Sequence, residues 1–367
     1  MLKRTYFYIG KQASFNEELI EAKNRLQPYY NANTLVGISF FISADEDTGY
    51  FIIRTAIIDF CKGHFGNLPV SIIAQPAGKG IAVEVWTHDT CTNLQHKRVY
   101  GLNYTTYEDA WGKALWGLGA ATADTALSFR EQADYAFELM KGVLAAEGYT
   151  FDDIVRQWNY IPRILTTSLE NGHCYQNYQL FNDIRQYYYG IYKRNSIYPA
   201  ATGIGTEAGV VSLDFFAVKK NEATRITGIA NPKQVNAYSY GQEVLVGSPI
   251  QANELKKAPL FERAKYIGTN EEALVFISGT ASILGELTIG INDVALQNRT
   301  TIANVTELTS QANCSNYSYL RVYVKRPEDT DTIREICTQR YGNIPVLYVK
   351  ADVCRDNLLV EIEGEAI

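Results

Sequence analysis

An internal repeat constrains the fold of this chain more than any other feature of its sequence. Residues 64–86 (HFGNLPVSIIAQPAGKGIAVEVW) match residues 340–363 (RYGNIPVLYVKADVCRDNLLVEIE), and Glu84 aligns with Glu361 once one residue is inserted. Each copy has an apolar run after Asn-x-Pro, a turn, and a second run in which apolar and polar residues alternate. This pattern predicts a β-hairpin in each copy. A chain that contains such copies is expected to consist of repeated units.

Helical patterns precede two of the copies. Apolar residues at helical spacing over residues 129–144 predict a long helix followed by a strand, and residues 293–308 with the strand 320–325 repeat this plan. A shorter helix is expected at 330–339, and a looser third copy runs over residues 181–216. The order strand, long helix, strand, short helix, strand, strand predicts an α+β fold in which mixed sheets pack on long helices.

Three units of this kind are expected along the 367 residues, a length that suits two or three compact cores. The N-terminal region, 1–222, is expected to hold two degenerate units, at about 1–90 and 92–222, of which the first matches only part of the pattern. Residues 223–265 are expected to form a connecting insert that contributes to a pocket. Residues 266–367 are expected to form the C-terminal unit, which is the most complete copy.

Composition excludes several classes of function. The net charge of -6, with acidic and basic residues interspersed, lacks the basic stripe of a nucleic-acid-binding surface. No stretch is long and apolar enough to span a membrane, and the N-terminus has no secretory apolar run, so we expect a cytoplasmic protein. The six cysteines form no C-x-x-C pairs and are expected to be free thiols. The four histidines lack metal-ligand spacing and no phosphate-binding glycine motif is present, so neither a metal nor a cofactor is predicted.

Short motifs in the last unit point to a known family. They are Ile277-Ser-Gly-Thr280, Asp293-Val-Ala-x-Gln297, Asn343-x-Pro345 and the VEIEG of residues 360–364. In this order they resemble the RidA/YjgF family of small α+β proteins. RidA-like proteins are trimers with sites between subunits. The resemblance therefore implies RidA-like units that form a pseudo-trimer within one chain, and a monomer with internal pseudo-threefold symmetry.

Further motifs occur in a fixed order over roughly residues 175–367. They are Tyr178-Gln-x-Phe-Asn-x-x-Arg185, Tyr198-Pro-Ala-Ala-Thr-Gly-Ile-Gly205, Asn231-Pro-x-Gln-x-x-Ala-Tyr-x-Tyr240, Phe261-x-Arg263-Ala264, Ser278-Gly-Thr-Ala-Ser282 and Asp352-x-Cys-Arg-x-x-Leu-Leu-x-Glu-x-x-Gly364. With the pseudo-trimeric build, they resemble the chorismatase family, which commonly serves secondary metabolism. The resemblance implies that chorismate is hydrolysed without a cofactor to pyruvate and a hydroxybenzoate. We favour 3-hydroxybenzoate, with 4-hydroxybenzoate or a dihydroxycyclohexadiene carboxylate as alternatives.

Glu361 is the predicted proton donor. Cleavage of the enol ether of chorismate begins with protonation of its methylene carbon, and a carboxylic acid in an apolar setting can stay protonated near neutral pH. Strand alternation puts Leu359, Glu361 and Glu363 on one face, so Glu361 is flanked by apolar neighbours. A solvated acid on an exposed face is the alternative. The resemblance identifies Glu361 with the catalytic glutamate of the family, and Glu84 is expected to be structural.

The two carboxylates of chorismate are suited to arginine side chains, because the guanidinium fork can donate two hydrogen bonds to one carboxylate. Arg263 and Arg185 lie inside family motifs and are predicted to bind the substrate. Arg163, which follows Tyr160-Ile-Pro, is a third candidate. The alternative for each of them is a surface ion pair.

Six further residues complete the predicted binding site. Tyr178, Tyr238 and Tyr240 could hydrogen-bond the substrate or position water, although packing in the core is as good an explanation. The Ser-Gly-Thr motif contributes Gly279 and Thr280, where the small glycine permits close approach of the backbone, although a plain turn is equally compatible. The last is Cys354, which is expected near the substrate ring; the alternative is a small buried apolar residue.

Two other functions stay open. One is the hydrolysis of enamines or imines by RidA-like proteins, many of which carry the arginine of x-Pro-x-Arg. Here Ser71, Ala201 and Leu347 occupy the corresponding positions, which weakens this alternative. The other is a non-catalytic relative that binds a small molecule. A binding protein would have no need of an acid on the last strand, so Glu361 weakens this alternative.

Overall fold

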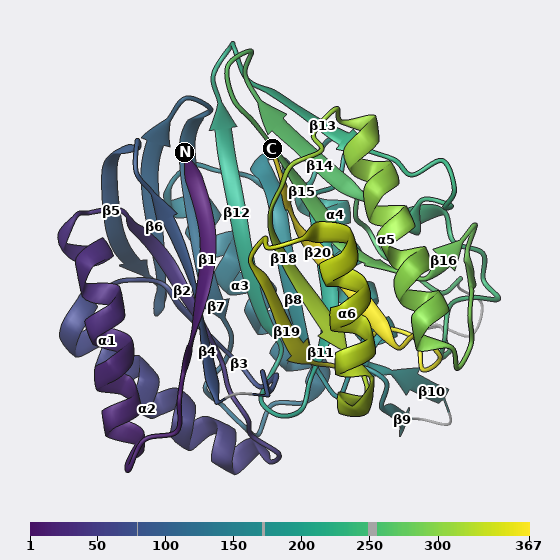
Figure 1. Ribbon diagram of the computed structural model, residues 1–367, viewed down its shortest axis with the longest axis horizontal. Coiled ribbons are helices and arrows are strands. Elements are labelled where there is room, and N and C mark those ends of the chain that lie inside the picture. The colour runs from purple at the N-terminus through teal and green to yellow at the C-terminus, as the bar shows by residue number, and fades with distance from the viewer. Residues whose placement is uncertain (79, 171–172, 249–254) are drawn as a thin grey trace.

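Three large β-sheets with helices on their outer sides make up most of the protein (Figure 1), and the described residues also form the two-stranded sheets β9–β10 and β16–β17. The computed structural model describes residues 1–78, 80–170, 173–248 and 255–367. Each large sheet is formed by one continuous region of the chain, so that the three sheets follow one another from the N-terminus to the C-terminus. The expected α+β class is therefore confirmed.

The first sheet has the strand order β1-β4-β2-β3, and both of its helices pack on one face through apolar side chains. Its elements are β1 (Leu2–Ile9), α1 (Phe15–Asn31), β2 (Leu35–Phe41), α2 (Asp47–Phe65), β3 (Val70–Ile73) and β4 (Ile81–His88). Residues 1–90 thus form a complete unit of four strands and two helices. The sequence of this region matches only part of the repeated pattern, although it forms four strands and two helices.

The second sheet has the strand order β11-β8-β12-β7-β6-β5. Its region contains β5 (Thr92–Val99), β6 (Leu102–Asp109), β7 (Gly112–Ala120), α3 (Phe129–Ala146), η1 (Phe151–Asp153), β8 (Ile154–Pro162), α4 (Asn177–Tyr192), β11 (Ala200–Thr206) and β12 (Ser212–Lys220). Before α4, the strands β9 (Thr167–Glu170) and β10 (His173–Gln176) form a separate pair. The long helix expected at 129–144 is confirmed.

The third sheet has the strand order β13-β14-β15-β20-β18-β19. Its region contains β13 (Arg225–Ile229), η2 (Ala237–Ser239), β14 (Ala264–Gly268), β15 (Ala273–Ala281), β16 (Ile283–Leu284), β17 (Leu287–Thr288), α5 (Val294–Gln311), β18 (Tyr317–Val324), η3 (Pro327–Asp329), α6 (Thr330–Tyr341), β19 (Val346–Lys350) and β20 (Val360–Ala366). Both ends of the insert 223–265 pair within this sheet, as β13 and β14. The division at residues 222 and 265 stays a proposal.

The three sheets share one connectivity. In each, a helix joins two parallel neighbours (β2 and β3, β8 and β11, β18 and β19), and the last strand of the unit pairs antiparallel with the first of these. The repeated segments are therefore not hairpins, because β2 lies between β3 and β4, and β18 lies between β19 and β20. Alternation predicted the strands correctly, but it carries no information about which strand is the neighbour.

Local sequence explains where the long helices begin. The Ser128 hydroxyl accepts from the backbone N–H of Glu131 (3.4 Å), and the Glu131 carboxylate accepts from the Ser128 N–H (2.8 Å), which forms a capping box at the start of α3. Asp293 caps α5 by accepting from the N–H of Leu296 (2.9 Å). These caps satisfy backbone donors that a helix start leaves unpaired, and they support the helix starts expected from the sequence.

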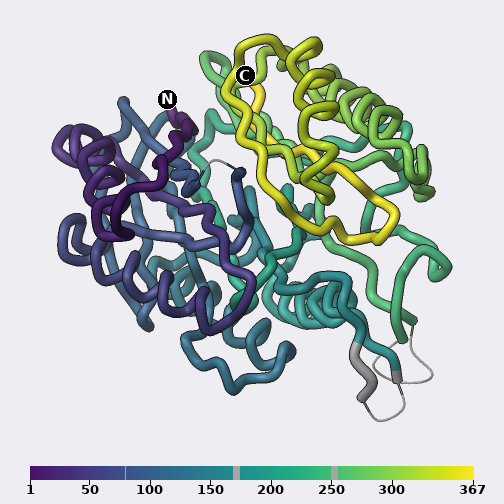
Figure 2. Tube along the Cα trace, turned by 60° about the horizontal axis from the view of Figure 1, so that its bottom comes forward, coloured from purple at the N-terminus to yellow at the C-terminus, as the bar shows by residue number. Residues whose placement is uncertain are grey.

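The three units meet around a shared core. One buried cluster contains Trp86, Trp116, Trp158, Phe276 and Tyr319, which come from all three sheets. Each unit contacts the other two, through β1 with β18, β3 with β7, and β11 with β15. Figure 2 shows the N-terminal, middle and C-terminal regions side by side in this arrangement. The shared connectivity and the mutual contacts are consistent with the expected pseudo-trimer.

Two further expectations concern covalent and membrane features. All six cysteines are free thiols, as expected. Among the described residues, no helix is long and apolar enough to cross a membrane.

Candidate active site

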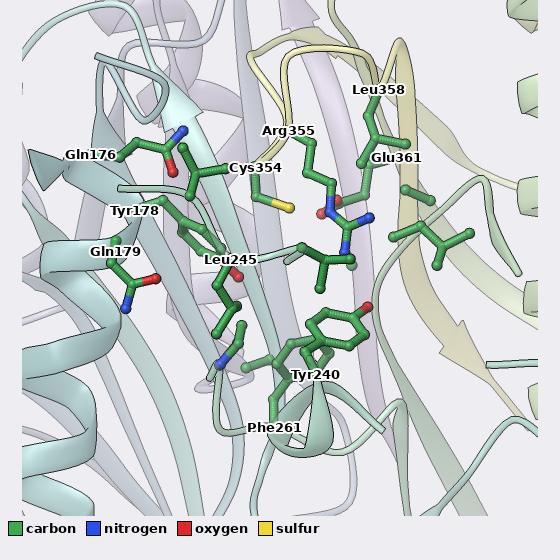
Figure 3. A pocket seen from close by; sticks show the side chains of 18 of the residues that line it. Gln176, Tyr178, Gln179, Tyr240, Leu245, Phe261, Cys354, Arg355, Leu358 and Glu361 are labelled. Atoms are coloured by element: carbon green, nitrogen blue, oxygen red, sulfur yellow. The ribbon is translucent and has the colours of Figure 1, made fainter. Parts of the chain in front are cut away.

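A pocket opens between the second and third units, where β11 contacts β15 (Figure 3). Its wall combines two arginines and one carboxylic acid with aliphatic and aromatic side chains. The residues that line it are Gln176, Tyr178, Gln179, Ala201, Gly203, Tyr240, Val244, Leu245, Val246, Pro259, Phe261, Arg263, Gly279, Ala281, Ile283, Cys354, Arg355, Leu358 and Glu361. This composition suits a small, mostly apolar molecule that carries anionic groups.

Glu361 supplies the carboxylic acid of this pocket. Alternation along β20 places Val360 and Ile362 in the core against α5, and Glu361 on the opposite face. The residue is only 4% exposed, and no hydrogen bond to its carboxyl is found among the described residues. Burial, together with the nearby negative charge of Glu363, raises the pKa of Glu361 to about 8. The group is therefore protonated at neutral pH.

Gly279 provides the space that the Glu361 carboxyl occupies. It lies in β15 at a break in the register between β15 and β20. A Cβ atom at this position would lie 2.1 Å from Glu361 Oε1, closer than any van der Waals contact allows. The Gly279 N–H donates to Thr202 Oγ1 (3.0 Å) in β11, which fixes the distance between the two units at this point.

Glu363, two residues further along the same face of β20, has a different environment. Its carboxylate forms ion pairs with Arg156 (2.7 Å), Arg4 (3.2 Å) and Arg321 (3.2 Å). It also accepts a hydrogen bond from Trp158 Nε1 (3.0 Å). Burial would raise its pKa, but the three guanidinium groups outweigh that effect and lower the pKa of Glu363 to about 2. Glu363 is therefore ionised.

Glu363 belongs to a buried group of charges to which all three units contribute, called here the central ion cluster. Its members are Arg4 of β1, Glu84 of β4, Arg156 of β8, Arg321 of β18, and Glu363 and Glu365 of β20. Glu84 pairs with Arg321 (2.5 Å) and Arg4 (2.9 Å), and Glu365 pairs with Arg4 (2.8 Å). Glu84 is thus a structural residue that links the first unit to the third.

The strand register corrects the alignment of the two copies. In the first sheet, Ser39 of β2 pairs with Glu84 of β4 on one side and with Ser71 of β3 on the other. In the third sheet, Arg321 of β18 pairs in the same way with Glu363 of β20 and with Leu347 of β19. Because Ser71 and Leu347 occupy the same place after Asn-x-Pro, the counterpart of Glu84 is Glu363. The alignment of Glu84 with Glu361 is wrong because the loops before β4 and β20 differ in length by more than the one residue assumed.

Arg263 and Arg355 approach the pocket from two different loops and flank the ring of Tyr240. Their guanidinium carbons lie 5.5 Å and 5.3 Å from the centre of that ring. Arg263 Nη2 donates to the Tyr240 hydroxyl (2.7 Å) and to the carbonyl of Val235 (2.6 Å), and Arg355 Nη1 donates to the carbonyl of Glu286 (2.7 Å). These contacts orient both cations and leave further N–H groups of each guanidinium for an anion.

Tyr178 and Cys354 face the same space as Glu361. In Figure 3 the Tyr178 hydroxyl, the Cys354 sulfur and the Arg355 guanidinium converge with the Glu361 carboxyl. Burial raises the pKa of the Tyr178 hydroxyl above its usual value of 10.0 and the pKa of Cys354 to about 12. Both side chains are therefore neutral at physiological pH, so Cys354 offers a neutral sulfur and not a thiolate nucleophile.

Comparisons with known proteins show similarity to chorismatases. Residues 84–217 match the model for the N-terminal part of the FkbO/Hyg5-like chorismatases. A 3-hydroxybenzoate synthase of Streptomyces hygroscopicus is 28% identical over 323 residues, which cover 82% of this chain and 85% of that protein. A chorismatase of the same organism is 31% identical over 223 residues, covering 58% of this chain and 60% of that protein.

A solved chorismatase structure has the same fold, with a TM-score of 0.74 at 20% identity, and the match covers 100% of this chain and 98% of that chain. The chain is therefore similar to chorismatases in part of its sequence and in its whole fold. Ala201 lines the pocket and offers no charge to an anion bound there, whereas Arg263 and Arg355 lie in its wall and supply two cations.

Four of the predicted binding residues do not line the pocket. Arg185 is buried behind Tyr178, where it interacts with the Tyr178 hydroxyl and donates to Asn182 Oδ1 (2.6 Å). Tyr238 packs against Tyr198 in a tilted arrangement, with ring centres 5.4 Å apart, and Thr280 donates to the carbonyl of Ser278 (2.9 Å). Each of these side chains is held by its own neighbours, so that direct contact with a pocket ligand is not supported.

Arg163 is the clearest correction. Its side chain is 46% exposed and pairs with Asp47 (2.9 Å) on the surface, away from the pocket. The alternative considered for it, a surface ion pair, describes what the structure shows. By contrast, Tyr178, Tyr240, Arg263, Gly279, Cys354 and Glu361 are brought together as the sequence predicts.

Sequence reasoning missed several residues of the pocket. Arg355 follows Cys354 directly in a family motif, and that position could have nominated it. Leu245 and Phe261 come from the insert 223–265, in which no periodic pattern distinguishes the pocket wall from the outer surface. In the described part of the chain, no group of three or more histidine, cysteine or acidic side chains is arranged to hold a metal ion.

Proposed function

We propose that this chain cleaves chorismate to pyruvate and 3-hydroxybenzoate, with Glu361 as the proton donor. The similarity to chorismatases and the shared fold support the reaction class. The choice of 3-hydroxybenzoate is supported by the similarity to the 3-hydroxybenzoate synthase, which extends over most of both chains. The observation that carries the mechanism is the protonated, buried Glu361 carboxyl that lines a pocket between two units.

The chemistry requires an acid that holds its proton at neutral pH. Glu361 meets this requirement because its pKa is raised to about 8. In the proposed step, the Glu361 carboxyl donates its proton to the methylene carbon of the enol ether, which becomes the methyl group of pyruvate. Water then adds to the oxocarbenium carbon, and the resulting hemiketal collapses to pyruvate as its bond to the ring oxygen breaks. That oxygen stays on the ring as the 3-hydroxyl, and loss of the 4-hydroxyl with the ring proton on C3, as water, gives 3-hydroxybenzoate. The Glu361 carboxylate left by proton transfer is stabilised by Arg156 and Arg263, whose positive charges act on it.

The two arginines of the pocket are proposed to bind the carboxylates of chorismate. Arg263 and Arg355 keep free N–H groups after their contacts with Tyr240 and the backbone, and both line the pocket with Glu361. A carboxylate of the substrate would accept charge-assisted hydrogen bonds from these free N–H groups. This arrangement anchors the anionic ends while the reacting carbon faces Glu361.

The remaining wall is proposed to hold the ring and limit the access of water. Leu245, Phe261 and Leu358 provide apolar surface, and Tyr178 can donate a hydrogen bond to a ring oxygen. Cys354 lies in the loop that leads to β20 and presents its neutral sulfur to the same space. An apolar enclosure also keeps the Glu361 carboxyl protonated, so binding and acid strength depend on the same residues.

The direct test is to incubate the purified protein with chorismate and to follow pyruvate with a coupled lactate dehydrogenase. We expect pyruvate in step with 3-hydroxybenzoate, identified by chromatography. The Glu361→Gln variant should lose about 10²-fold or more in kcat, because the amide cannot donate an acidic proton. Glu328→Gln, a change of the same kind at an exposed position, is the matched control and should keep the rate.

No pyruvate above background would refute the proposed function, and full activity of the Glu361→Gln variant would refute the role of Glu361. A different aromatic product, or a diol, would keep the reaction class and replace the product. The monomeric state and the cytoplasmic location stay predictions.

A further inference from the structure

Thr202 occupies a junction between the pocket and the central ion cluster. It lies in β11 and is 1% exposed. Its hydroxyl accepts hydrogen bonds from Arg156 Nη2 (2.6 Å) and from the Gly279 N–H (3.0 Å), and it donates to Glu363 Oε2. One donor and two acceptor sites are all that a hydroxyl group offers, so the orientation of Thr202 is fully determined.

We propose that Thr202 and Glu363 are positioning residues that hold the Glu361 carboxyl in its place and in its protonated form. This inference rests on the proposed function of the same pocket. Neither Thr202 nor Glu363 lines the pocket, so both would act through Glu361 and not on the substrate.

Gly279 connects Thr202 to the Glu361 carboxyl. Glu361 Oε1 lies against Gly279, so close that a methyl group there would overlap with it. The N–H of Gly279 is bound to the hydroxyl of Thr202 at a break in the β15–β20 register. Gly279 itself is not paired with β20, so the hydrogen bond to Thr202 is what holds this part of β15 against the Glu361 carboxyl.

The electrostatic part follows from the charges around Glu361. The charged and titratable groups around it are Glu363 on β20, its cross-strand partner Tyr323 on β18, Arg156 on β8, Arg263 before β14, Cys354 and Arg355 in the loop before β20, and Tyr178 on α4. The arginines favour the ionised form of Glu361. Glu363 is the one anion among them, and its negative charge opposes the loss of the Glu361 proton.

Glu363 can have this effect only if it stays ionised itself. Arg156, Arg4 and Arg321 keep it so, and the Thr202 hydroxyl donates to the same oxygen that pairs with Arg156. Two carboxyl groups on one strand face are thereby held in opposite protonation states. Catalytic sites with two carboxyl groups use such different environments to keep one group protonated as the acid, here Glu361, and the other ionised, here Glu363.

The test compares Glu363→Gln and Thr202→Val with the wild-type protein. In Glu363→Gln, the alkaline limb of the pH profile of kcat/KM should move to lower pH by about one unit, because the opposing charge is lost. In Thr202→Val, kcat should fall about tenfold with little change in KM, because the carboxyl is misplaced while the substrate-binding groups are intact. Thr202→Ser keeps the hydroxyl and should restore most of the rate.

Thr105→Val is the matched control, because Thr105 is fully buried and donates to the carbonyl of Val36 (2.7 Å) in another part of the molecule. It makes the same change in the core and should leave kcat unaffected. A Thr202→Val variant with wild-type kcat, or one in which Thr202→Ser is as slow as Thr202→Val, would overturn the positional role. A folded Glu363→Gln variant with an unmoved alkaline limb would overturn the electrostatic role.

A second readout separates this inference from the proposed function. The infrared band of the protonated Glu361 carboxyl, identified as the band that the Glu361→Gln variant lacks, can be titrated without any substrate. We expect its midpoint to fall in Glu363→Gln. If chorismate is not turned over but the midpoint still falls, only the proposed function fails; an unchanged midpoint refutes the role of Glu363 whatever the activity. Should Glu363→Gln not fold, Thr202→Val with its serine rescue decides the positional role, which does not depend on the charge of Glu363.

Discussion

Glu361 and Glu363 lie two residues apart on the same face of one strand, and both are almost completely buried, yet their pKa values are shifted in opposite directions. Glu361 borders the pocket and has no hydrogen-bond partner among the described residues. Glu363 lies in the central ion cluster and is surrounded by three arginines. The comparison teaches that burial raises the pKa of a carboxyl group, and that three guanidinium groups together are enough to reverse this effect at Glu363.

The two regions also differ in what they do for the fold. The central ion cluster joins the three units, because Arg4, Arg156 and Arg321 come from different sheets. The pocket, by contrast, joins only the second and third units and leaves its acid unpaired. Changes in the cluster should therefore affect stability most, and changes at the pocket should affect the reaction most. The predictions below test this division.

The largest expected effect is the loss of stability in Glu84→Gln. Glu84 balances Arg321 and Arg4 at 2.5 Å and 2.9 Å, and the neutral amide would leave these buried cations with too little negative charge. Removing one partner of a buried ion pair typically costs about 3–5 kcal/mol of unfolding free energy. Denaturant unfolding of both proteins measures the difference. A loss below about 1 kcal/mol would show that the cluster does not hold the units together.

Features that depend on neighbouring residues could be predicted from the sequence, whereas contacts between distant segments could not. The helices expected at 129–144, 293–308 and 330–339 and the alternation along β20 are local patterns, and they were predicted correctly, whereas α1, α2 and α4 were not predicted. The family motifs nominated Glu361, Arg263, Tyr240 and Gly279, which all line the pocket. The local pattern did not reveal the neighbour of each strand, so the predicted hairpins and the alignment of Glu84 with Glu361 were wrong.

The central ion cluster itself could not be predicted in this way. Arg4, Arg156 and Arg321 are far apart in the sequence, and an isolated arginine between apolar residues is usually read as an exposed one. Their meeting depends on how three sheets pack, which no single segment encodes. The error over Arg163 has the same origin, because position in a motif-like string cannot distinguish a pocket from the outer surface.

The next prediction concerns the pH dependence of stability. The folded-state pKa of Glu361 is raised from 4.5 to about 8. Its contribution to the unfolding free energy is therefore fully present below pH 4.5 and is lost as the pH rises toward 8, by about 1.4 kcal/mol per pH unit. Glu361→Gln should remove this part of the slope, whereas Glu365 and Asp214, whose pKa values are raised to about 7, keep their own parts.

Unfolding curves of both proteins at several pH values between 5 and 8 provide the check. Identical slopes would mean that Glu361 is already ionised in the folded protein at neutral pH, and the contrast with Glu363 would then disappear. A steeper slope in the variant is also incompatible with the burial described for Glu361.

A smaller effect is expected for Gly279→Ala. The new methyl group would lie 2.1 Å from Glu361 Oε1, so the carboxyl must move within the pocket. We expect kcat to fall about tenfold, or about 1.4 kcal/mol, because the proton donor is displaced from the reacting carbon. Gly241→Ala, where the nearest atoms belong to the flexible Glu286 side chain, is a control of the same size. Equal rates for the two variants would contradict the close packing of Glu361 on Gly279.

The smallest effect is expected for Arg163→Ala, which tests a surface arginine for comparison with the arginines of the pocket and of the central ion cluster. Its ion pair with Asp47 is about half exposed, and such pairs contribute at most about 1 kcal/mol. We expect wild-type kcat and KM for chorismate and a change in unfolding free energy within that range. Arg263→Ala, measured in parallel, should raise KM by at least tenfold through the loss of a charge-assisted bond to the substrate. If Arg163→Ala raised KM as much as Arg263→Ala, the substrate would have to contact the surface where Arg163 pairs with Asp47 of α2. The pocket around Glu361 could then not be the whole binding site.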